Sequence, residues 1–227
     1  MRNKHIFPVV MLMGIAAFSV VTQTQATMKG EKPDDSPGWV VVEEDWFFPL
    51  MYDSSETFHQ ARAHFRRNEE TAAANELTRA GSWLRYAASH ARPETKKSLQ
   101  KAAEDLTALA EDLKKGELHS ARTLDVAIAQ ASHALSEWHY YKAKDQLGQQ
   151  DAKRAAQHLR AAAHYLRTAA DSANFEYGSD VVAVYDSIDR YGMNEEFVVE
   201  PNVVSKDLSA VEHELERVAD KLKTVSK

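Results

Sequence analysis

The chain has 227 residues, no cysteine and a formal net charge of −6 at pH 7. Without cysteine it has no disulfide, thiol nucleophile, thiolate metal site or c-type haem attachment. The negative charge argues against nucleic acid as a partner, because phosphate binding needs a basic surface. The length suits one domain with a sizeable core.

Residues 1–26 have the three-part pattern of a secretory signal peptide. Arg2 and Lys4 give a basic start, 6–21 is an apolar run, and small residues precede a cleavage point after Ala26. The apolar run is shorter than the roughly 20 residues that a membrane-spanning helix needs. We therefore expect a processed protein in the periplasm, with outright secretion as the alternative.

The polar stretch 27–38 predicts a flexible leader, and 39–227 is then a single helical domain. The runs 39–42 and 196–199 favour β structure, and we expect them to pair and join the ends of this domain. An aromatic cluster occupies 46–52. Two interpretations stay open for this cluster: a plug over an end or groove of the helices, or a surface for a partner or apolar ligand.

The most strongly patterned stretch is 150–173. Leu159 and Leu166 share one face with alanines, while basic and amide side chains occupy the opposite face. This spacing predicts an amphipathic helix with an alanine-rich seam, which lets neighbouring helices approach closely.

Similar stripes predict helices over 54–67, 69–91, 93–115, 117–146 and 205–225, and a short helix between Ser179 and Gly192. Pro93 suits a first turn, and Gly116 after two lysines suits a helix end. The fold class is therefore all-α: a bundle of antiparallel helical hairpins with about six to seven helices. The hairpin core spans about 54–173, and 174–227 forms a C-terminal cap.

The hairpins repeat along the chain. Asn68, Gly116 and Gln150 stand at three turns, and an alanine follows each at the same spacing. Residues 59–91 align with 141–173 without a gap, which indicates duplication. This pattern, over about 58–173, resembles tetratricopeptide-like helical hairpins and, more loosely, the YfdX family of secreted bacterial helical proteins. The YfdX resemblance implies a secreted, non-catalytic protein linked to stress, with no active site to carry over.

No catalytic motif stands out: the chain lacks a Gly-x-Ser-x-Gly elbow, a phosphate-binding glycine loop and His-Glu-x-x-His. A buried di-metal site would need two inward Glu-x-x-His motifs. The motif at Glu56 and His59 points away from the core, because Phe58 faces inward. The candidates for weaker zinc or copper binding, by imidazoles that flank the seams or pair across helices, are His59, His64, His139 and His158. His133 and His164 lie opposite the seams and should be solvated.

Two functions follow as hypotheses. The first is a non-catalytic periplasmic scaffold or binding protein for a protein or envelope component, with no enzyme activity and no resident cofactor. Its candidate contact residues, aromatic side chains at the seam edges, are Trp83, Tyr140, Tyr141 and Tyr165. The alternative is a metal- or cofactor-binding bundle that uses the four histidines. The aromatic cluster and the last helix suit self-association as well as intramolecular packing.

Overall fold

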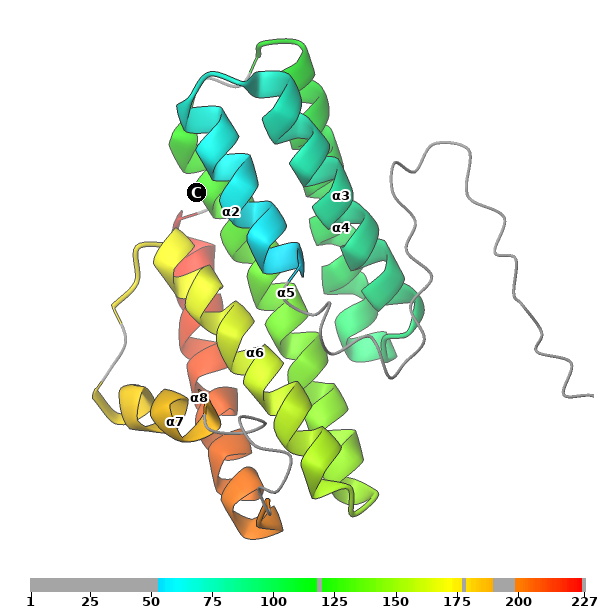
Figure 1. Cartoon of the computed structure of the whole chain (residues 1–227), viewed down its shortest axis with the longest axis vertical. Coiled ribbons are helices and arrows are strands. Elements are labelled where there is room, and N and C mark those ends of the chain that lie inside the picture. The colour runs from blue at the N-terminus through cyan, green and yellow to red at the C-terminus, as the bar shows by residue number, and fades with distance from the viewer. Residues whose placement is uncertain (1–52, 118–119, 177–178, 190–198, 226–227) are drawn as a thin grey trace, which may run out of the picture. The chain divides into compact units, whose positions relative to one another are not determined.

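A computed structural model describes residues 53–117, 120–176, 179–189 and 199–225, all within one compact unit that spans 32–227. These ranges contain seven helices and no strand, so the prediction of an all-α helical bundle is confirmed. The helices are α2 (Asp53–Arg66), α3 (Glu70–Ser89), α4 (Pro93–Lys114), α5 (Ala121–Gly148), α6 (Ala152–Ser172), α7 (Ser179–Asp189) and α8 (Pro201–Val225) (Figure 1).

The helix α6 forms where the sequence predicts it. Its predicted seam is fully buried, and Leu159 and Leu166 are both 0% exposed. Asp151 caps the start of α6, since its carboxylate accepts a hydrogen bond from the backbone N–H of Arg154 at 2.9 Å. The last helix differs from the prediction, because α8 begins at Pro201 rather than at Ser205. Proline is well suited to a first helical turn, where its missing N–H has no partner to lose.

The central element is α5, which packs against α2, α3 and α4 and also against α6 and α8 (Figure 1). It contributes to two hydrophobic clusters. The first cluster joins α5 to α2, α3 and α4, and includes Ile128 and Leu135. The second joins α5 to α6, α7 and α8, and includes Tyr140 and Ala143. One long helix therefore carries two cores on different sides.

The three predicted turn residues all adopt the left-handed conformation. The backbone φ is 58° at Asn68, 70° at Gly116 and 65° at Gln150. In each turn the next residue's N–H reaches back to a helix carbonyl: Glu69 to His64, Glu117 to Asp112 and Asp151 to Gln146, each at 2.9 Å. This helix-ending geometry is the Schellman motif. Asn174, with φ 51°, ends α6 in the same way.

Several sequence predictions lie outside the described residues. These are the signal peptide 1–26, the leader 27–38, the run 39–42, the aromatic cluster 46–52 and residues 196–198 of the second β-favouring run. Val199 is described and belongs to no strand. None of the helices within the described ranges is both long enough and apolar enough to cross a membrane.

Candidate functional site

A buried pair of histidines lies between α5 and α6. His139 is 1% exposed and His158 is 8% exposed. Their Nδ1 atoms are 3.1 Å apart, so one imidazole donates a hydrogen bond to the other. Both rings lie at the α5–α6 interface because each histidine is next to a core residue. His139 follows Trp138, and His158 precedes Leu159.

Aromatic rings pack around the pair. The ring of Tyr165 stacks on that of His139, with centroids 5.7 Å apart and planes 7° apart. The ring of Trp138 is also close to that of His139, with centroids 4.7 Å apart and planes 52° apart. His139 and His158 are themselves 5.4 Å apart between centroids. The imidazoles thus form part of an aromatic cluster at the junction of the two cores.

The environment of the pair favours the neutral form of both rings. Burial is the main cause that lowers the pKa of His158 from 6.5 to about 4, and Lys142 and Arg154 lower it further. Burial also holds the pKa of His139 well below its usual value, with added repulsion from His158, Lys142 and His164. These groups are therefore uncharged at neutral pH and serve as packing and hydrogen-bonding residues.

Of the four histidines that the sequence suggested for zinc or copper, the structure brings two together, His139 and His158. Two nitrogen ligands of a tetrahedral zinc are roughly 3.3 Å apart, given bonds of about 2.0–2.1 Å, so the spacing alone is compatible. Among the described residues, however, no group of three or more His, Cys, Asp or Glu side chains could hold a metal ion. The cationic neighbours that lower the histidine pKa values would also oppose a divalent cation.

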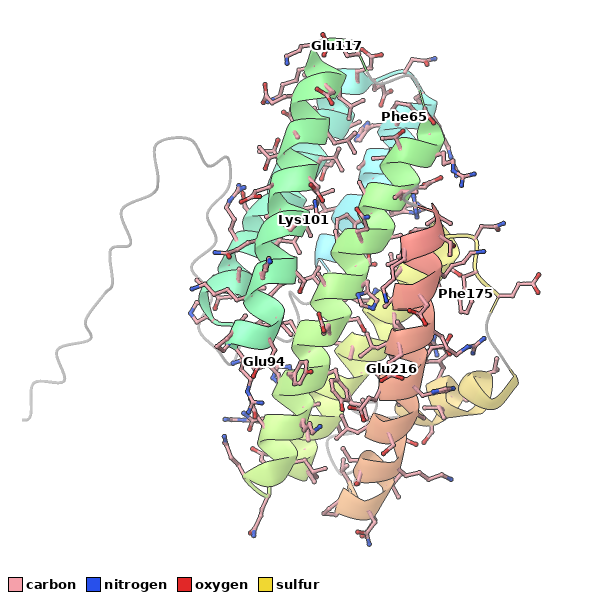
Figure 2. All side chains as sticks on the ribbon, turned by 180° about the vertical axis from the view of Figure 1, so that it is seen from behind. Phe65, Glu94, Lys101, Glu117, Phe175 and Glu216 are labelled. Atoms are coloured by element: carbon pink, nitrogen blue, oxygen red, sulfur yellow. The ribbon has the colours of Figure 1, made fainter. Side chains whose placement is uncertain are left out.

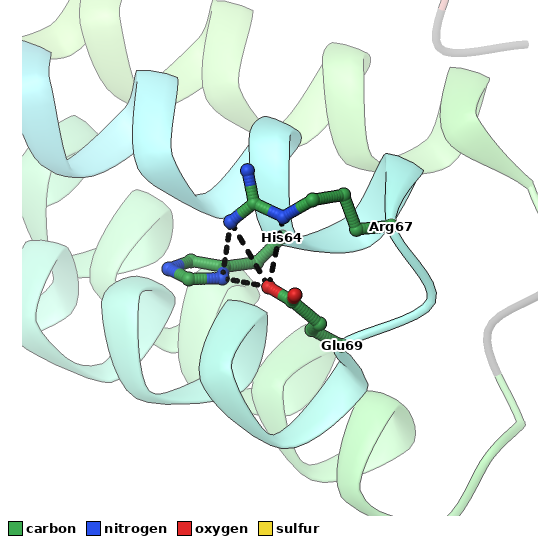
Figure 3. A network of polar contacts seen from close by, with 3 residues as sticks. All are labelled: His64, Arg67 and Glu69. Carbon is green, nitrogen blue, oxygen red and sulfur yellow. Dashed lines mark hydrogen bonds and ion pairs between the residues drawn. The ribbon is translucent and has the colours of Figure 1, made fainter.

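The other two candidate histidines lie apart from the pair, on α2. His59 is exposed, as is Glu56, and Phe58 is buried, so the predicted outward orientation of the Glu-x-x-His motif is confirmed. His64 takes part in a surface network, with its Nδ1 2.5 Å from Oε2 of Glu69 (Figure 3).

Arg67 completes this surface network. Its Nε donates to the carboxylate of Glu69 at 3.0 Å. Hydrogen bonds from Arg67 and then His64 lower the pKa of Glu69. This network joins the end of α2 to the residue before α3, so its role is to hold the turn.

The four aromatic residues predicted as a contact surface divide into two groups. Tyr140 is 3% exposed and Tyr165 is 2% exposed, so both belong to the cores. Trp83 and Tyr141 are half-buried and reach the surface. Helical spacing placed all four at the edges of the apolar stripes, but the close approach of alanine-lined helices leaves Tyr140 and Tyr165 almost fully buried.

Polar groups beneath α8 were not predicted from the sequence. Glu214 is 0% exposed, and its Oε2 accepts a hydrogen bond from Arg217 at 2.7 Å. The Arg217 guanidinium lies 5.1 Å from the ring centroid of Phe175, beside α8 (Figure 2). Glu214 lies three residues after Val211 and four before Val218, both buried, so helical spacing places it on the apolar stripe and could have indicated its burial.

His133 and His164 are half-buried rather than solvated, so that prediction was wrong. The Nε2 of His133 lies 3.0 Å from the backbone carbonyl oxygen of Leu215, to which it donates. The face of α5 opposite its first seam is covered by α8. A helix that packs on two sides has no face that is fully exposed to solvent. The prediction assigned α5 a single apolar stripe and therefore did not anticipate the packing of α8 on the opposite face.

A hollow of about 400 Å³ lies where the start of α5 meets the ends of α6 and α8. Its lining residues are Arg122, Asp125, Val126, Ser172, Ala173, Asn174, Lys221 and Val225. Asp125 accepts a hydrogen bond from Nε of Arg62 on α2 at 2.7 Å. None of the buried histidines or aromatic residues described above lines this hollow.

Comparisons with known proteins add no assignment. The chain matches no family model, and searches of curated proteins and of solved structures found no match. The resemblance to YfdX and tetratricopeptide-like proteins therefore stays a prediction.

Proposed function

We propose that this chain is a non-catalytic helical scaffold or binding protein of the bacterial periplasm. The observation that carries the proposal is the use of its buried polar groups. The imidazoles of His139 and His158 bond to each other across α5 and α6. The hydroxyl of Ser136 donates to the backbone carbonyl of Ala162 at 2.6 Å across the same interface. These groups hold helices together, whereas catalytic groups must reach a substrate.

The contact surface of this scaffold includes Trp83 and Tyr141. Both side chains are half-buried, and such rings combine a large contact area with a polar atom for a hydrogen bond. The signal-peptide pattern and the resemblance to secreted stress-linked proteins support a role in the cell envelope, with a protein or an envelope component as the proposed partner.

Site-specific photo-crosslinking in the bacterial envelope tests this function. A photoreactive phenylalanine analogue would replace Trp83 or Tyr141, and the control would replace Lys101, an exposed residue of α4 (Figure 2). We expect a discrete crosslinked product from positions 83 and 141 that is absent from position 101. Equal products from all three positions would show random collision and would remove the support for a contact surface.

The alternative, a metal-binding bundle, has its own test. Untagged protein expressed to the periplasm would be analysed for metal and heated with added zinc or copper. A ligand that binds the folded state raises the melting temperature by mass action. One metal per chain, with a rise that the His158→Leu variant loses, would move this alternative ahead of the scaffold.

A further inference from the structure

The wall of the hollow at the end of the bundle contains two cationic side chains, Arg122 and Lys221. Arg122 is exposed and Lys221 is half-buried, and neither side chain forms an ion pair with a described residue. The carboxylate in the wall, Asp125, is already paired with Arg62 at 2.7 Å. Two positive charges therefore remain around the hollow, in a chain whose formal net charge is −6.

The hollow is large enough for an organic molecule. Its volume of about 400 Å³ equals roughly a dozen times the volume of a water molecule in the liquid. Binding pockets for small molecules commonly measure about 300–1,000 Å³. A single inorganic ion would leave most of this space to water.

The rest of the wall suits a molecule with one charged and one apolar part. Val126, Ala173 and Val225 supply an apolar lining next to the cations. Asn174 stands at the left-handed turn that ends α6, with φ 51°. In that turn the carbonyl oxygens of Ala170 and Asp171 accept hydrogen bonds from Phe175 and Asn174, which weakens the negative field of the helix end towards the hollow.

We propose that this hollow binds a small organic oxyanion, a carboxylate or phosphate that carries an apolar substituent. Arg122 and Lys221 hold the charged group, and Val126 and Val225 contact the apolar part. The site is independent of the aromatic contact surface, since it shares no residue with Trp83 or Tyr141 and lies at the end of the bundle.

The test is a titration of the full processed chain with small-molecule probes. Isothermal titration calorimetry measures the binding, and the NMR chemical shifts of the Asn174 and Val126 amides locate it. The probes are phenyl phosphate, benzoate, inorganic phosphate and the neutral benzamide. We expect saturable binding of phenyl phosphate or benzoate in the millimolar range or tighter, weaker binding of inorganic phosphate, and none of benzamide. The ranking of phenyl phosphate against benzoate identifies which oxyanion the site prefers.

Variants separate a specific site from general attraction. Arg122→Gln and Lys221→Gln should each weaken binding about tenfold or more, since charged hydrogen bonds contribute on the order of 1.5–3 kcal/mol. The matched control is Lys96→Gln, an exposed lysine on α4. All three positions are at the surface, so the variants should fold. No saturable binding by either organic anion, an equal loss in Lys96→Gln, or equal binding of benzamide would overturn the proposal.

Discussion

The hairpins α2–α3 and α5–α6 have the same backbone plan and different buried contents. Both turn through a left-handed residue, Asn68 in one and Gln150 in the other, with φ of 58° and 65°. Leu77 of the first hairpin aligns with Leu159 of the second, and both are 0% exposed. Yet Glu76 occupies the position aligned with His158, and Thr57, two residues before the aligned stretch, corresponds to His139 at the same offset.

The two aligned positions differ in whether a polar side chain pairs at the surface or lies buried between the helices. In the first hairpin Glu76 forms an ion pair at the surface with Arg79, at 3.1 Å. In the second, the aligned histidine is buried and bonded to another imidazole. The duplicated plan explains the fold in both halves. Among the described residues of the two hairpins, the buried histidine side chains, whose charge state can change, are His139 and His158 of α5–α6, so the two hairpins should respond differently to pH.

The largest expected effect tests what the hairpins share. Leu77→Ala and Leu159→Ala should each lower the free energy of unfolding by about 2–5 kcal/mol, because each leaves a cavity among alanines that cannot move in to fill it. Because α5 contributes to both clusters, we expect one cooperative unfolding transition in urea. Circular dichroism and tryptophan fluorescence would both monitor this transition. Two separate transitions, each shifted by one variant only, would show that the halves unfold independently.

The second largest expected effect is a dependence of stability on pH that arises from the α5–α6 hairpin. An unfolded histidine takes up a proton near pH 6.5, while His158 in the fold stays neutral down to about pH 4. The unfolded state therefore binds more protons in this window. Stability should be full above pH 6.5 and fall as the pH drops towards 4, by on the order of 3 kcal/mol for His158. Urea unfolding at a series of pH values measures the slope.

The double variant His139→Leu/His158→Leu should have a flatter pH profile than the wild type. Its stability at pH 7 should change little, since both hydrogen-bonding partners are replaced together. His59→Gln, an exposed change on α2, is the control and should keep the wild-type profile. A double variant with an unchanged slope would assign the acid sensitivity to other groups.

Most of the fold was predictable because helix patterns are local. The stripe around Leu159 and the turn residues Asn68, Gly116 and Gln150 were identified from spacing alone, and the structure confirms them. The last helix was predicted from residue 205, whereas it begins at Pro201. Proline is also common at the edges and ends of strands, so its presence alone does not mark the start of a helix.

The candidate site was predictable only in part. His139 and His158 were identified as seam-flanking residues, but their mutual distance depends on how α5 and α6 cross, which no single-helix pattern contains. The burial of Glu214 and the contact of His133 with α8 depend on a third helix. Long-range pairings of this kind require the assembled bundle.

A matched pair of serines on α5 sharpens the comparison within the second half. Ser136 and Ser132 are both 0% exposed. The Ser136 hydroxyl donates to the carbonyl of Ala162 at 2.6 Å, whereas the Ser132 hydroxyl has no partner among the described residues. We expect Ser136→Ala to cost about 1 kcal/mol and Ser132→Ala to be neutral or stabilising, measured by urea unfolding at pH 7. Equal losses would mean that packing volume, and not the hydrogen bond, sets the cost.

The smallest effect concerns the turns. A side chain at positive φ costs roughly 1 kcal/mol, less for asparagine, and glycine removes this cost. Gln150→Gly should therefore raise the free energy of unfolding by about 0.5–1 kcal/mol, and Asn68→Gly by less. Gly116→Ala is the reverse change at φ 70° and should lower it by about 1 kcal/mol. Thermal unfolding of the three variants measures the order. If Gln150→Gly destabilises the protein, the Gln150 side chain stabilises the α5–α6 turn by more than the strain that its backbone carries, and the two turns are not equivalent.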